Sequence, residues 1–329
     1  MCPELDVWLP AFNAEATLAA AVESVRRQTF RDWRLLLVDD GSTDRTPEIA
    51  AGLAARDERI RVLRIPHGGI VAALLAAAAA SDASRFARMD ADDLAHPRRF
   101  ERQLASSADI VGARTRITGA QGQGMNTFIH WQNSLLTHED HVRELFVESP
   151  LAHPTALVRR SAYDRAGGYR VQDGPEDYDL WIRMWETGAR FEKVPRILLD
   201  WSDAPGRLTR SSPDYSEEAF RRVKLAHLAR HPVLRGGRVT VWGAGPVGRR
   251  WMRDLRAIGI EVACAIDIDP RKIGRVVAGG VRILTPEDAF AAGTSAVLGA
   301  VGSRGARAII RRRLLARKLV EGADFLFLA

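Results

Sequence analysis

Three aspartates lie close together in the sequence RMDADD. Asp90, Asp92 and Asp93 directly follow residues 85–89, a short run whose pattern predicts a β-strand. Carboxylates crowded at the end of a strand repel one another unless a cation neutralises them. Mg²⁺ or Mn²⁺ takes one or two such carboxylates and completes its coordination with water and phosphate oxygens. The cluster therefore predicts a metal site that holds a diphosphate; the alternative is an acidic helix N-terminus ahead of Pro97.

Strand-like and helical patterns alternate around this cluster, which is typical of an α/β sheet built from crossover units. We predict strands at 5–9, 34–38, 60–65, 85–89 and 197–200, and helices at 15–28 and 70–80. Ligands of open α/β sheets bind beyond the carboxyl ends of the strands. The residues expected at that edge are Pro10, Asp39, Asp40, Asp90 and Asp92.

Composition limits the class of protein. The chain has 329 residues, enough for two domains, and a net charge of +7. Its arginines are scattered among 41 acidic residues, which argues against nucleic-acid binding and leaves a weak attraction to anionic lipid headgroups open. Two cysteines favour a reducing compartment. No signal peptide is evident, and the longest apolar run, 70–80, is shorter than the roughly 20 residues of a membrane span. We expect a cytoplasmic protein, soluble or peripheral to the inner face of a membrane.

Five segments, in this order and spacing, resemble the family 2 glycosyltransferases with a GT-A fold. They are VWLPAFNAEATL, LLLVDDGSTDRTPEIA, ARMDADDLAHPRRFERQL, AHPTALVRRSAYDRAGGYR and GPEDYDLWIRM. The resemblance implies an α/β GT-A domain over residues 1–212. It implies inverting transfer of a sugar from a nucleotide diphosphate donor, expected to be a UDP-sugar. The implied acceptor is a hydroxyl of a glycan, a lipid-linked glycan or another compound, in cell-surface polysaccharide or glycoconjugate synthesis.

The resemblance also assigns the donor side of the site. Pro10, Ala11 and Phe12 match the stretch that lines the base and ribose pocket, with Phe12 standing where Tyr is common. Asp39 and Asp40 match a pair from which one carboxylate accepts a hydrogen bond from the pyrimidine ring. The alternative is that these two acids are turn residues that cap the next helix.

The metal is implied by the match of Asp90 and Asp92 to the DxD motif. Asp92 is expected to coordinate Mg²⁺ or Mn²⁺, while Asp90 reaches toward the ribose or a metal-bound water. A bound cation would stabilise the negative charge that develops on the leaving diphosphate. Asp93 is expected to act only as a helix cap.

Transfer also needs a base for the acceptor hydroxyl, a role worth roughly 10²–10⁴-fold in rate. Of the acids in PEDYDLWIRMWE, the resemblance selects Asp177 as the base and Glu176 as a neighbour that positions the acceptor. Asp179 fits the first turn of the helix that follows. A helix N-cap is the alternative role for Asp177. His153 matches a stretch on the acceptor side, with a plain loop residue as its alternative.

This chain departs from the family pattern in three places. Leu75 stands where Asn is usual, and His67-Gly68 stands where an Asn-Gly pair is usual. Relatives often place Arg and His in a flexible segment that closes over the diphosphate. Here the segment WSDAPGRLTRSSPDYS offers Arg207 and Arg210, which we predict as weaker phosphate partners.

A second domain is predicted after a connecting helix and linker at 213–235. Residues 236–329 begin with a strand, a glycine turn and a helix, and they resemble small Rossmann-like modules appended to sugar-modifying enzymes. The G-x-G-x-x-G pattern and its acid about 20 residues on are Gly243, Gly245, Gly248 and Asp267. The glycine turn suits a phosphate at the helix N-terminus. No catalytic His, Lys or Tyr pair accompanies it, so we expect any nucleotide to be held rather than transformed.

Three other functions remain open at this stage. One is an NAD(P)-dependent oxidoreductase centred on 236–329, which the missing catalytic pair disfavours. Another is a sugar-nucleotide-binding protein that never transfers its ligand. The third is a nucleotidyltransferase, disfavoured because LPAFNAEATL lacks a glycine-rich loop with a lysine. We expect a metal-dependent inverting glycosyltransferase.

Overall fold

The chain forms two compact units. The computed structural model describes residues 3–119, 122–203, 212–277, 279–293, 295–303 and 305–329. The first unit comprises Met1–His141 and Pro150–Ser216, and the second comprises Val142–Ser149 and Glu217–Ala329. Compared with the expected limits at 212 and 236, the second unit also takes the connecting helix and one short segment from the middle of the first.

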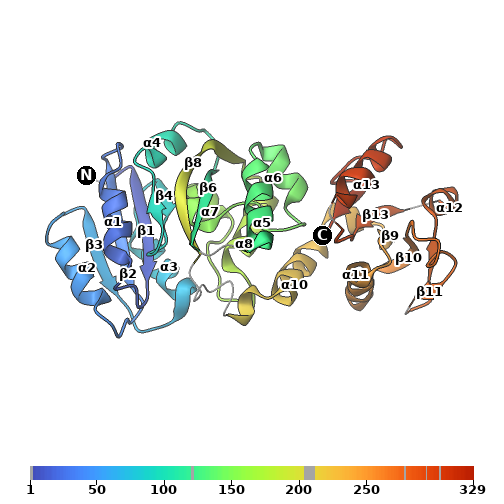
Figure 1. Ribbon diagram of the computed structural model, residues 1–329, viewed down its shortest axis with the longest axis horizontal. Helices are drawn as coiled ribbons and strands as arrows, with labels where there is room; N and C mark the ends of the chain where they lie inside the picture. Colours follow the sequence, from blue (N-terminus) through green and yellow to red (C-terminus); the bar gives the residue numbers. More distant parts are fainter. Residues whose placement is uncertain (1–2, 120–121, 204–211, 278, 294, 304) are drawn as a thin grey trace. The chain divides into compact units, whose positions relative to one another are not determined.

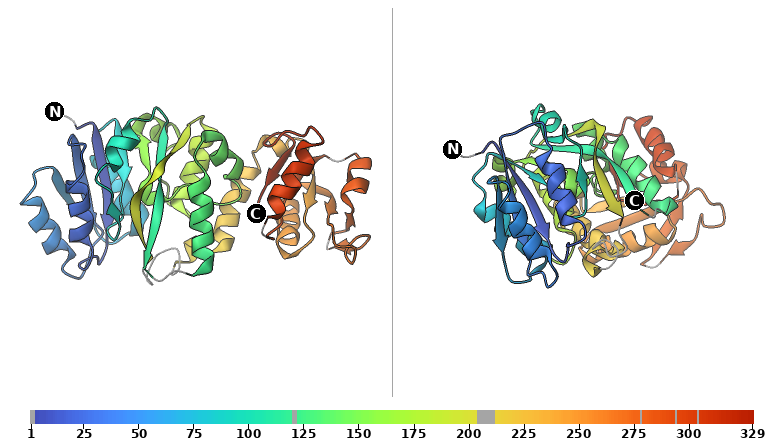
Figure 2. Two further views of the ribbon diagram at one scale, coloured as in Figure 1. Left: turned by 45° about the horizontal axis from the view of Figure 1, so that its top comes forward. Right: turned by 60° about the vertical axis from the view of Figure 1, so that its left-hand side comes forward.

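Four parallel strands form one half of the first unit's sheet, in the order β3-β2-β1-β4 (Figure 1). In both views of Figure 2 these blue and cyan strands follow one another across one end of the sheet. Alternate residues such as Val7 and Leu35 join the core cluster that includes Val22 of α1, while α3 packs against β1 and β2. Both faces are therefore covered, which explains why these strands are apolar throughout. The bounds are β1 Leu5–Ala11, α1 Leu18–Arg26, β2 Trp33–Asp39, α2 Thr46–Ala54, β3 Ile60–Arg64, α3 Gly69–Ala80 and β4 Arg85–Arg88.

The other half of this sheet is mixed, in the order β4-β7-β6-β8-β5. β7 runs antiparallel to β4 and β6, and the short β5 runs antiparallel to β8. These pairings bring the end of β4 beside segments more than sixty residues later in the chain. The bounds are β5 Leu94–Ala95, α4 Arg99–Leu104, β6 Ile110–Gly119, α5 Gln123–Ser134, α6 His138–Glu144, η1 His153–Thr155, β7 Leu157–Arg159, α7 Arg160–Arg165, α8 Glu176–Glu186, β8 Phe191–Asp203 and η2 Pro213–Tyr215.

Each predicted strand of the first unit is present, with shifts at its ends. The expected strand at 197–200 is part of the longer β8. The expected role of Asp93 as a helix cap is wrong, because β5 follows it and the next helix begins at Arg99. The same finding excludes an acidic helix N-terminus at this turn.

The second unit has a six-stranded sheet in the order β11-β12-β10-β9-β13-β14. All its pairings are parallel except β11 with β12, and the strand order reverses direction at β9. Val147 packs in its core with Trp242 and Phe325, and Lys224 donates to the carbonyl of Val147 at 2.5 Å. Segment 142–149 is thus part of this core. The bounds are α10 Glu217–Leu228, η3 Pro232–Leu234, β9 Arg238–Trp242, α11 Pro246–Ala257, β10 Glu261–Ile266, β11 Val276–Val277, β12 Val281–Leu284, α12 Pro286–Ala291, β13 Ala296–Gly299, α13 Ala306–Leu315 and β14 Phe325–Phe327.

Within the described ranges, no helix combines the length and the apolar character that crossing a bilayer requires.

Candidate active site

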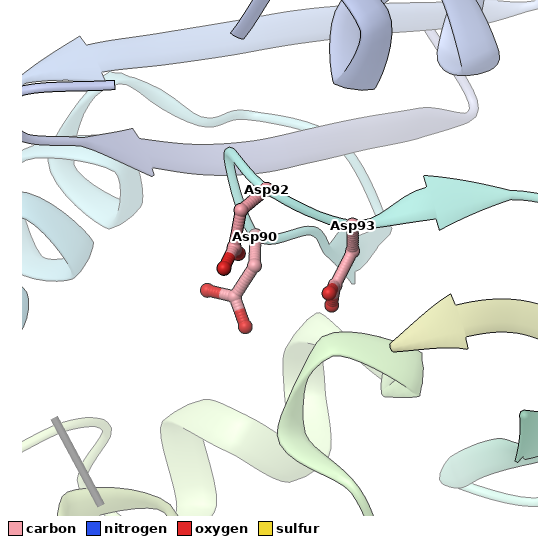
Figure 3. A group of neighbouring side chains, drawn as sticks. All are labelled: Asp90, Asp92 and Asp93. Atoms are coloured by element: carbon pink, nitrogen blue, oxygen red, sulfur yellow. The ribbon is translucent and has the colours of Figure 1, made fainter. Parts of the chain in front are cut away.

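The three aspartates form one cluster in the turn between β4 and β5. Asp90, Asp92 and Asp93 each offer a carboxylate oxygen, and these oxygens lie within 4.8 Å of one another (Figure 3). Asp90 and Asp92 are partly exposed, whereas Asp93 is buried. Asp93 Oδ1 accepts the N–H of Ser202 in β8 at 2.8 Å. Burial, followed by the charges of Asp90 and Asp92, holds the pKa of Asp93 well above its usual range. The arrangement provides hard oxygen ligands for a divalent cation.

Two buried guanidinium groups lie behind this turn. Arg88 is the last residue of β4, is 1% exposed, and forms an ion pair with Asp90 Oδ1. Arg99 of α4 donates to the carbonyl oxygen of Arg88 at 2.7 Å, and burial lowers the pKa of Arg99 to about 9. Sequence reasoning missed both residues. A charged residue that ends an otherwise buried strand is the signal that could have found Arg88.

The acids expected to serve the acceptor begin α8. Glycines at 167 and 168 turn the chain with φ of 77° and 64°, and Pro175 then starts the helix. Because Pro175 occupies the N-cap position, the alternative role of Asp177 as N-cap is wrong. Burial, then the charge of Glu176, raises the pKa of Asp177 well above its usual range. Burial also raises the pKa of Glu176. Both carboxyl groups are therefore stronger bases than carboxyl groups in water.

The turn and the helix start belong to one electrostatic site. The positive charge of Arg88 lowers the pKa of both Glu176 and Asp177, and the negative charge of Asp90 raises that of Glu176. Asp179, by contrast, pairs with Arg183 at 2.7 Å on its own helix, as a structural residue does. The structure thus brings the aspartate cluster and the acids at the start of α8 into one electrostatic site, from sequence positions more than eighty residues apart.

His153 lies beside Glu176. Its Nδ1 is 3.5 Å from Glu176 Oε1, and its Nε2 is 2.7 Å from the hydroxyl of Tyr169. Burial, then the charge of Arg88, lowers the pKa of His153 well below its usual value, so the ring is neutral. Tyr215, from η2, donates to Glu176 Oε2 at 2.5 Å. Neither tyrosine was found from the sequence.

The expected donor side carries an exposed aromatic pair. Phe12 is 45% exposed, and its ring stacks on that of His67 with centroids 4.1 Å apart. It follows Pro10 and Ala11 at the end of β1. Such a platform suits the flat face of a nucleobase. The roles of all three residues in binding a donor stay predictions.

The two acids at the end of β2 both hold loops in place. Asp40 accepts the N–H groups of Gly68 and Gly69 at 2.8 and 2.9 Å, so it caps α3 and not the next helix. Asp39 Oδ1 accepts the N–H of Ser42 at 3.0 Å, and its Oδ2 lies 3.3 Å from Arg64 Nε. The pyrimidine contact remains a prediction for this pair.

Two predicted residues cannot be placed. Arg207 and Arg210 lie outside the described residues.

The glycine turn of the second unit is tightly built. A Cβ on Gly243, whose φ is 126°, would lie 2.5 Å from the carbonyl oxygen of Ala300, and one on Gly248 would lie 1.8 Å from that of Gly243. A Cβ on Gly245 would meet nothing within 4 Å. The first and third glycines therefore serve packing, while the second borders open space.

Asp267 is fully engaged with the chain around it. Its Oδ2 accepts the N–H of Ala244 and the Nζ of Lys272, both at 3.0 Å, and its Oδ1 accepts the N–H groups of Ile268 and Asp269 at 2.9 and 3.0 Å. Burial alone would raise the pKa of Asp267, but these contacts outweigh it and lower the pKa. The acid holds the glycine turn in place; a ribose contact stays a prediction.

Comparison with known proteins identifies relatives of this chain. The family model for glycosyl transferase family 2 matches residues 6–167. The putative glycosyltransferase EpsE of Bacillus subtilis (strain 168) is 31% identical over 238 residues, which cover 68% of this chain and 84% of EpsE. The O-antigen biosynthesis glycosyltransferase WbnJ of Escherichia coli is 27% identical over 190 residues, covering 55% of this chain and 72% of WbnJ.

Solved structures share the fold. TarS 1-349 of S. aureus, in complex with UDP-GlcNAc, matches with a TM-score of 0.56 at 18% identity, over 70% of this chain and 67% of that chain. The mannosyltransferase PcManGT of Pyrobaculum calidifontis, in complex with GDP-Man and Mn²⁺, matches with a TM-score of 0.50 at 17% identity, over 79% and 70% of the two chains. The predicted α/β GT-A fold is confirmed.

Proposed function

This chain belongs to glycosyl transferase family 2 and is a glycosyltransferase, and from that premise we propose that it is a metal-dependent inverting enzyme that uses a UDP-sugar. The observation that carries the proposal is the meeting of two acidic groups around one buried arginine. Asp90, Asp92 and Asp93 supply one group, and Glu176 and Asp177 supply the other. No such arrangement is needed for packing, since buried charges cost free energy unless they are compensated.

The aspartate cluster would hold Mg²⁺ or Mn²⁺, which prefer oxygen ligands. A bound cation would supply charge stabilisation for the departing nucleoside diphosphate. Asp92 is partly exposed and is proposed as the direct ligand, whereas Asp90 is oriented by Arg88. Asp93 is buried and offers a third carboxylate oxygen beside those of Asp90 and Asp92. Mn²⁺ bound to PcManGT supports the choice of cation.

Asp177 is proposed to take the proton of the acceptor hydroxyl as that oxygen attacks the anomeric carbon. Its raised pKa makes it a stronger base than an aspartate in water. The nearby charge of Arg88 opposes this rise and favours the ionised form, in which Asp177 accepts a proton. Attack from the face opposite the leaving diphosphate inverts the anomeric carbon. The acceptor is proposed to be a glycan or lipid-linked glycan, and the name of WbnJ supports a role in polysaccharide synthesis.

The donor is tested by measuring binding. Thermal shifts of the full chain would be recorded with UDP, GDP, UDP-glucose, UDP-N-acetylglucosamine and GDP-mannose, each with Mn²⁺ or with EDTA. We expect the largest shift with a uridine nucleotide and Mn²⁺. A larger shift with GDP compounds would overturn the donor assignment, and equal shifts in EDTA would overturn the metal requirement.

We also propose peripheral association with an anionic membrane, through α13 of the second unit. Over residues 309–320, which comprise most of α13 and the five residues after it, exposed aliphatic side chains are interspersed with exposed basic ones. Ile309, Leu315 and Val320 are 50%, 50% and 57% exposed. Within the described ranges, Arg312, Arg313 and Lys318 form no ion pair. Aliphatic groups beside cations suit a lipid surface better than nucleic acid.

Sedimentation with lipid vesicles tests this association. The full chain is expected to pellet with phosphatidylcholine vesicles that contain phosphatidylglycerol and to stay in solution with phosphatidylcholine alone. Changing Arg312 and Arg313 to Gln should weaken pelleting. If the chain pellets with neither vesicle type, the proposal is refuted.

A further inference from the structure

Glu176 is held by a tyrosine that lies 39 residues later in the chain. Tyr215 ends the short turn η2, which begins where Ser212 Oγ accepts the N–H of Asp214 at 3.3 Å. One residue after Tyr215, the first unit ends. The segment that leads toward the second unit thus contributes a side chain to the acceptor side of the site.

The two carboxylate oxygens of Glu176 have different surroundings. Oε2 accepts the hydroxyl of Tyr215 at 2.5 Å. Oε1 is buried and makes no hydrogen bond in the described part of the chain. Nδ1 of His153 is 3.5 Å away from it, too far for a normal hydrogen bond. Since buried polar atoms are nearly always paired, an unpaired one in a site is a position for a ligand group.

The neighbours of Oε1 do not compete for it. His153 is neutral, because burial and the charge of Arg88 lower its pKa, so no imidazolium charge attracts the carboxylate. The other ring nitrogen of His153 is already engaged with Tyr169 at 2.7 Å. With Oε2 fixed by Tyr215, the direction of Oε1 is fixed as well.

We propose that Tyr215 is a positioning residue for the acceptor. Its hydroxyl orients Glu176 so that Oε1 accepts a hydrogen bond from one hydroxyl of the acceptor sugar, next to the hydroxyl whose proton Asp177 removes. This inference rests on the proposed function. A positioning role predicts different effects on transfer and on donor hydrolysis, whereas a packing role does not. Water has no second hydroxyl for Glu176 to bind, so hydrolysis needs Asp177 but not the Tyr215–Glu176 contact.

The experiment compares transfer with hydrolysis in the full chain. Donors would be the nucleotide sugars named above with Mn²⁺, and acceptors would be p-nitrophenyl hexosides, with water as the competing acceptor. Tyr215→Phe is expected to lower kcat for transfer about 10- to 100-fold, as loss of a charge-assisted hydrogen bond does. Donor hydrolysis and donor affinity should be unchanged. In a Glu176→Gln background, Tyr215→Phe should cost no more than about twofold.

Ser212→Ala is the matched control, because it weakens the same turn without touching Glu176. It should change neither rate. Equal loss of transfer and hydrolysis in Tyr215→Phe, or full additivity with Glu176→Gln, would show a packing role and overturn the inference alone. A wild-type protein that neither transfers nor hydrolyses any of these donors would instead overturn the proposed function and this inference together.

If donors are hydrolysed but no hexoside accepts sugar, crystal structures of the wild-type chain and Tyr215→Phe decide. We expect the Glu176 carboxylate to leave its position in the variant. A carboxylate in the same place in both structures would overturn the inference.

Discussion

The two units carry acids at equivalent edges of their sheets, in opposite electrostatic situations. In the first, Asp90, Asp92 and Asp93 gather after β4, where Arg88 forms an ion pair with Asp90 and the pKa of Asp93 is raised. In the second, Asp267 after β10 has four partners and a lowered pKa. Position at the carboxyl edge of an α/β sheet is therefore not enough to identify a site.

The difference teaches how to separate a reactive acid from a structural one. A structural acid has its hydrogen bonds and counter-charge supplied by the chain, so burial is compensated. A reactive group is left undercompensated, and its raised pKa records the missing partner. Asp93, Glu176 and Asp177 have raised pKa values, as the second kind does. The variants below test whether acids with a raised pKa serve the reaction and acids with a lowered pKa serve the stability of the fold.

The largest effect is expected from Asp177→Asn, which keeps the shape of the side chain and removes the proton acceptor. Transfer should fall by roughly 10²–10⁴-fold while donor affinity is retained. Single-turnover rates and donor binding would be measured on the same samples. Asp173→Asn, an exposed acid in the preceding loop, is the control and should be silent. Near-normal turnover of Asp177→Asn would place the base elsewhere.

A smaller effect is expected from Asp92→Ala, in which the partly exposed member of the aspartate cluster is removed. Mn²⁺-dependent affinity for UDP should fall at least about 10- to 100-fold without unfolding, because loss of a direct ligand should cost no less than loss of a residue that supports one. Asp267→Asn should leave that affinity intact, because its carboxylate serves the other sheet. Calorimetry with UDP and Mn²⁺ measures both variants. Equal losses in the two would contradict the division between the units.

How far the sequence predicts this site depends on the range of the contacts involved. The strands β1 to β4 and the acids that follow them were predicted because each depends on a short local pattern. Tyr215 was not, because its partner is set by the folded chain: Tyr215 and Glu176 are 39 residues apart. Arg88 was also missed, although its partner Asp90 is only two residues away, because its burial is set by the fold. Asp93 was misassigned for the same reason, since the pairing of β5 with β8 spans about a hundred residues. The transfer of segment 142–149 to the second unit also leaves no local pattern.

A still smaller effect, opposite in sign for the two units, is expected in the stability of the metal-free protein. The folded pKa of Asp93 is raised, so its contribution to stability is present below the unfolded value of about 3.9 and is lost as pH rises through the folded pKa. Asp93→Asn avoids that loss and should be more stable than wild type at pH 8, with the gain shrinking toward pH 5. Urea unfolding in EDTA measures this difference.

Asp267 should behave in the opposite way. Its folded pKa is lowered, so its contribution is present above the unfolded value and is lost as pH falls through the folded pKa. Asp267→Asn should therefore be less stable than wild type at both pH 5 and pH 8, by about 1–3 kcal/mol for the lost charge-assisted hydrogen bonds. The same sign of change in both variants at pH 8 would refute the distinction between compensated and undercompensated acids.

The smallest effect is expected at Gly245, where the second unit borders open space. Gly245→Ala adds a Cβ that meets nothing within 4 Å at an ordinary φ of −80°, so unfolding should change by less than about 0.5 kcal/mol and transfer should be unaffected. Gly248→Ala is the matched contrast, because its Cβ would lie 1.8 Å from the carbonyl of Gly243 and must move α11 away from the turn. It should cost about 1–3 kcal/mol.

The same pair of variants decides whether the open space at Gly245 is a ligand site. Calorimetry of the full chain with NAD and with nucleotide sugars, in EDTA to remove any metal-dependent binding, gives the affinity of the second unit. If a phosphate binds at the start of α11, as the glycine pattern predicts, Gly245→Val should abolish that binding while transfer is retained. Absence of heat in the wild-type chain would mean that the turn serves only packing. If a folded Gly245→Val chain loses transfer, the second unit takes part in catalysis. The contrast between the two sheet edges would then no longer distinguish catalytic acids from structural ones.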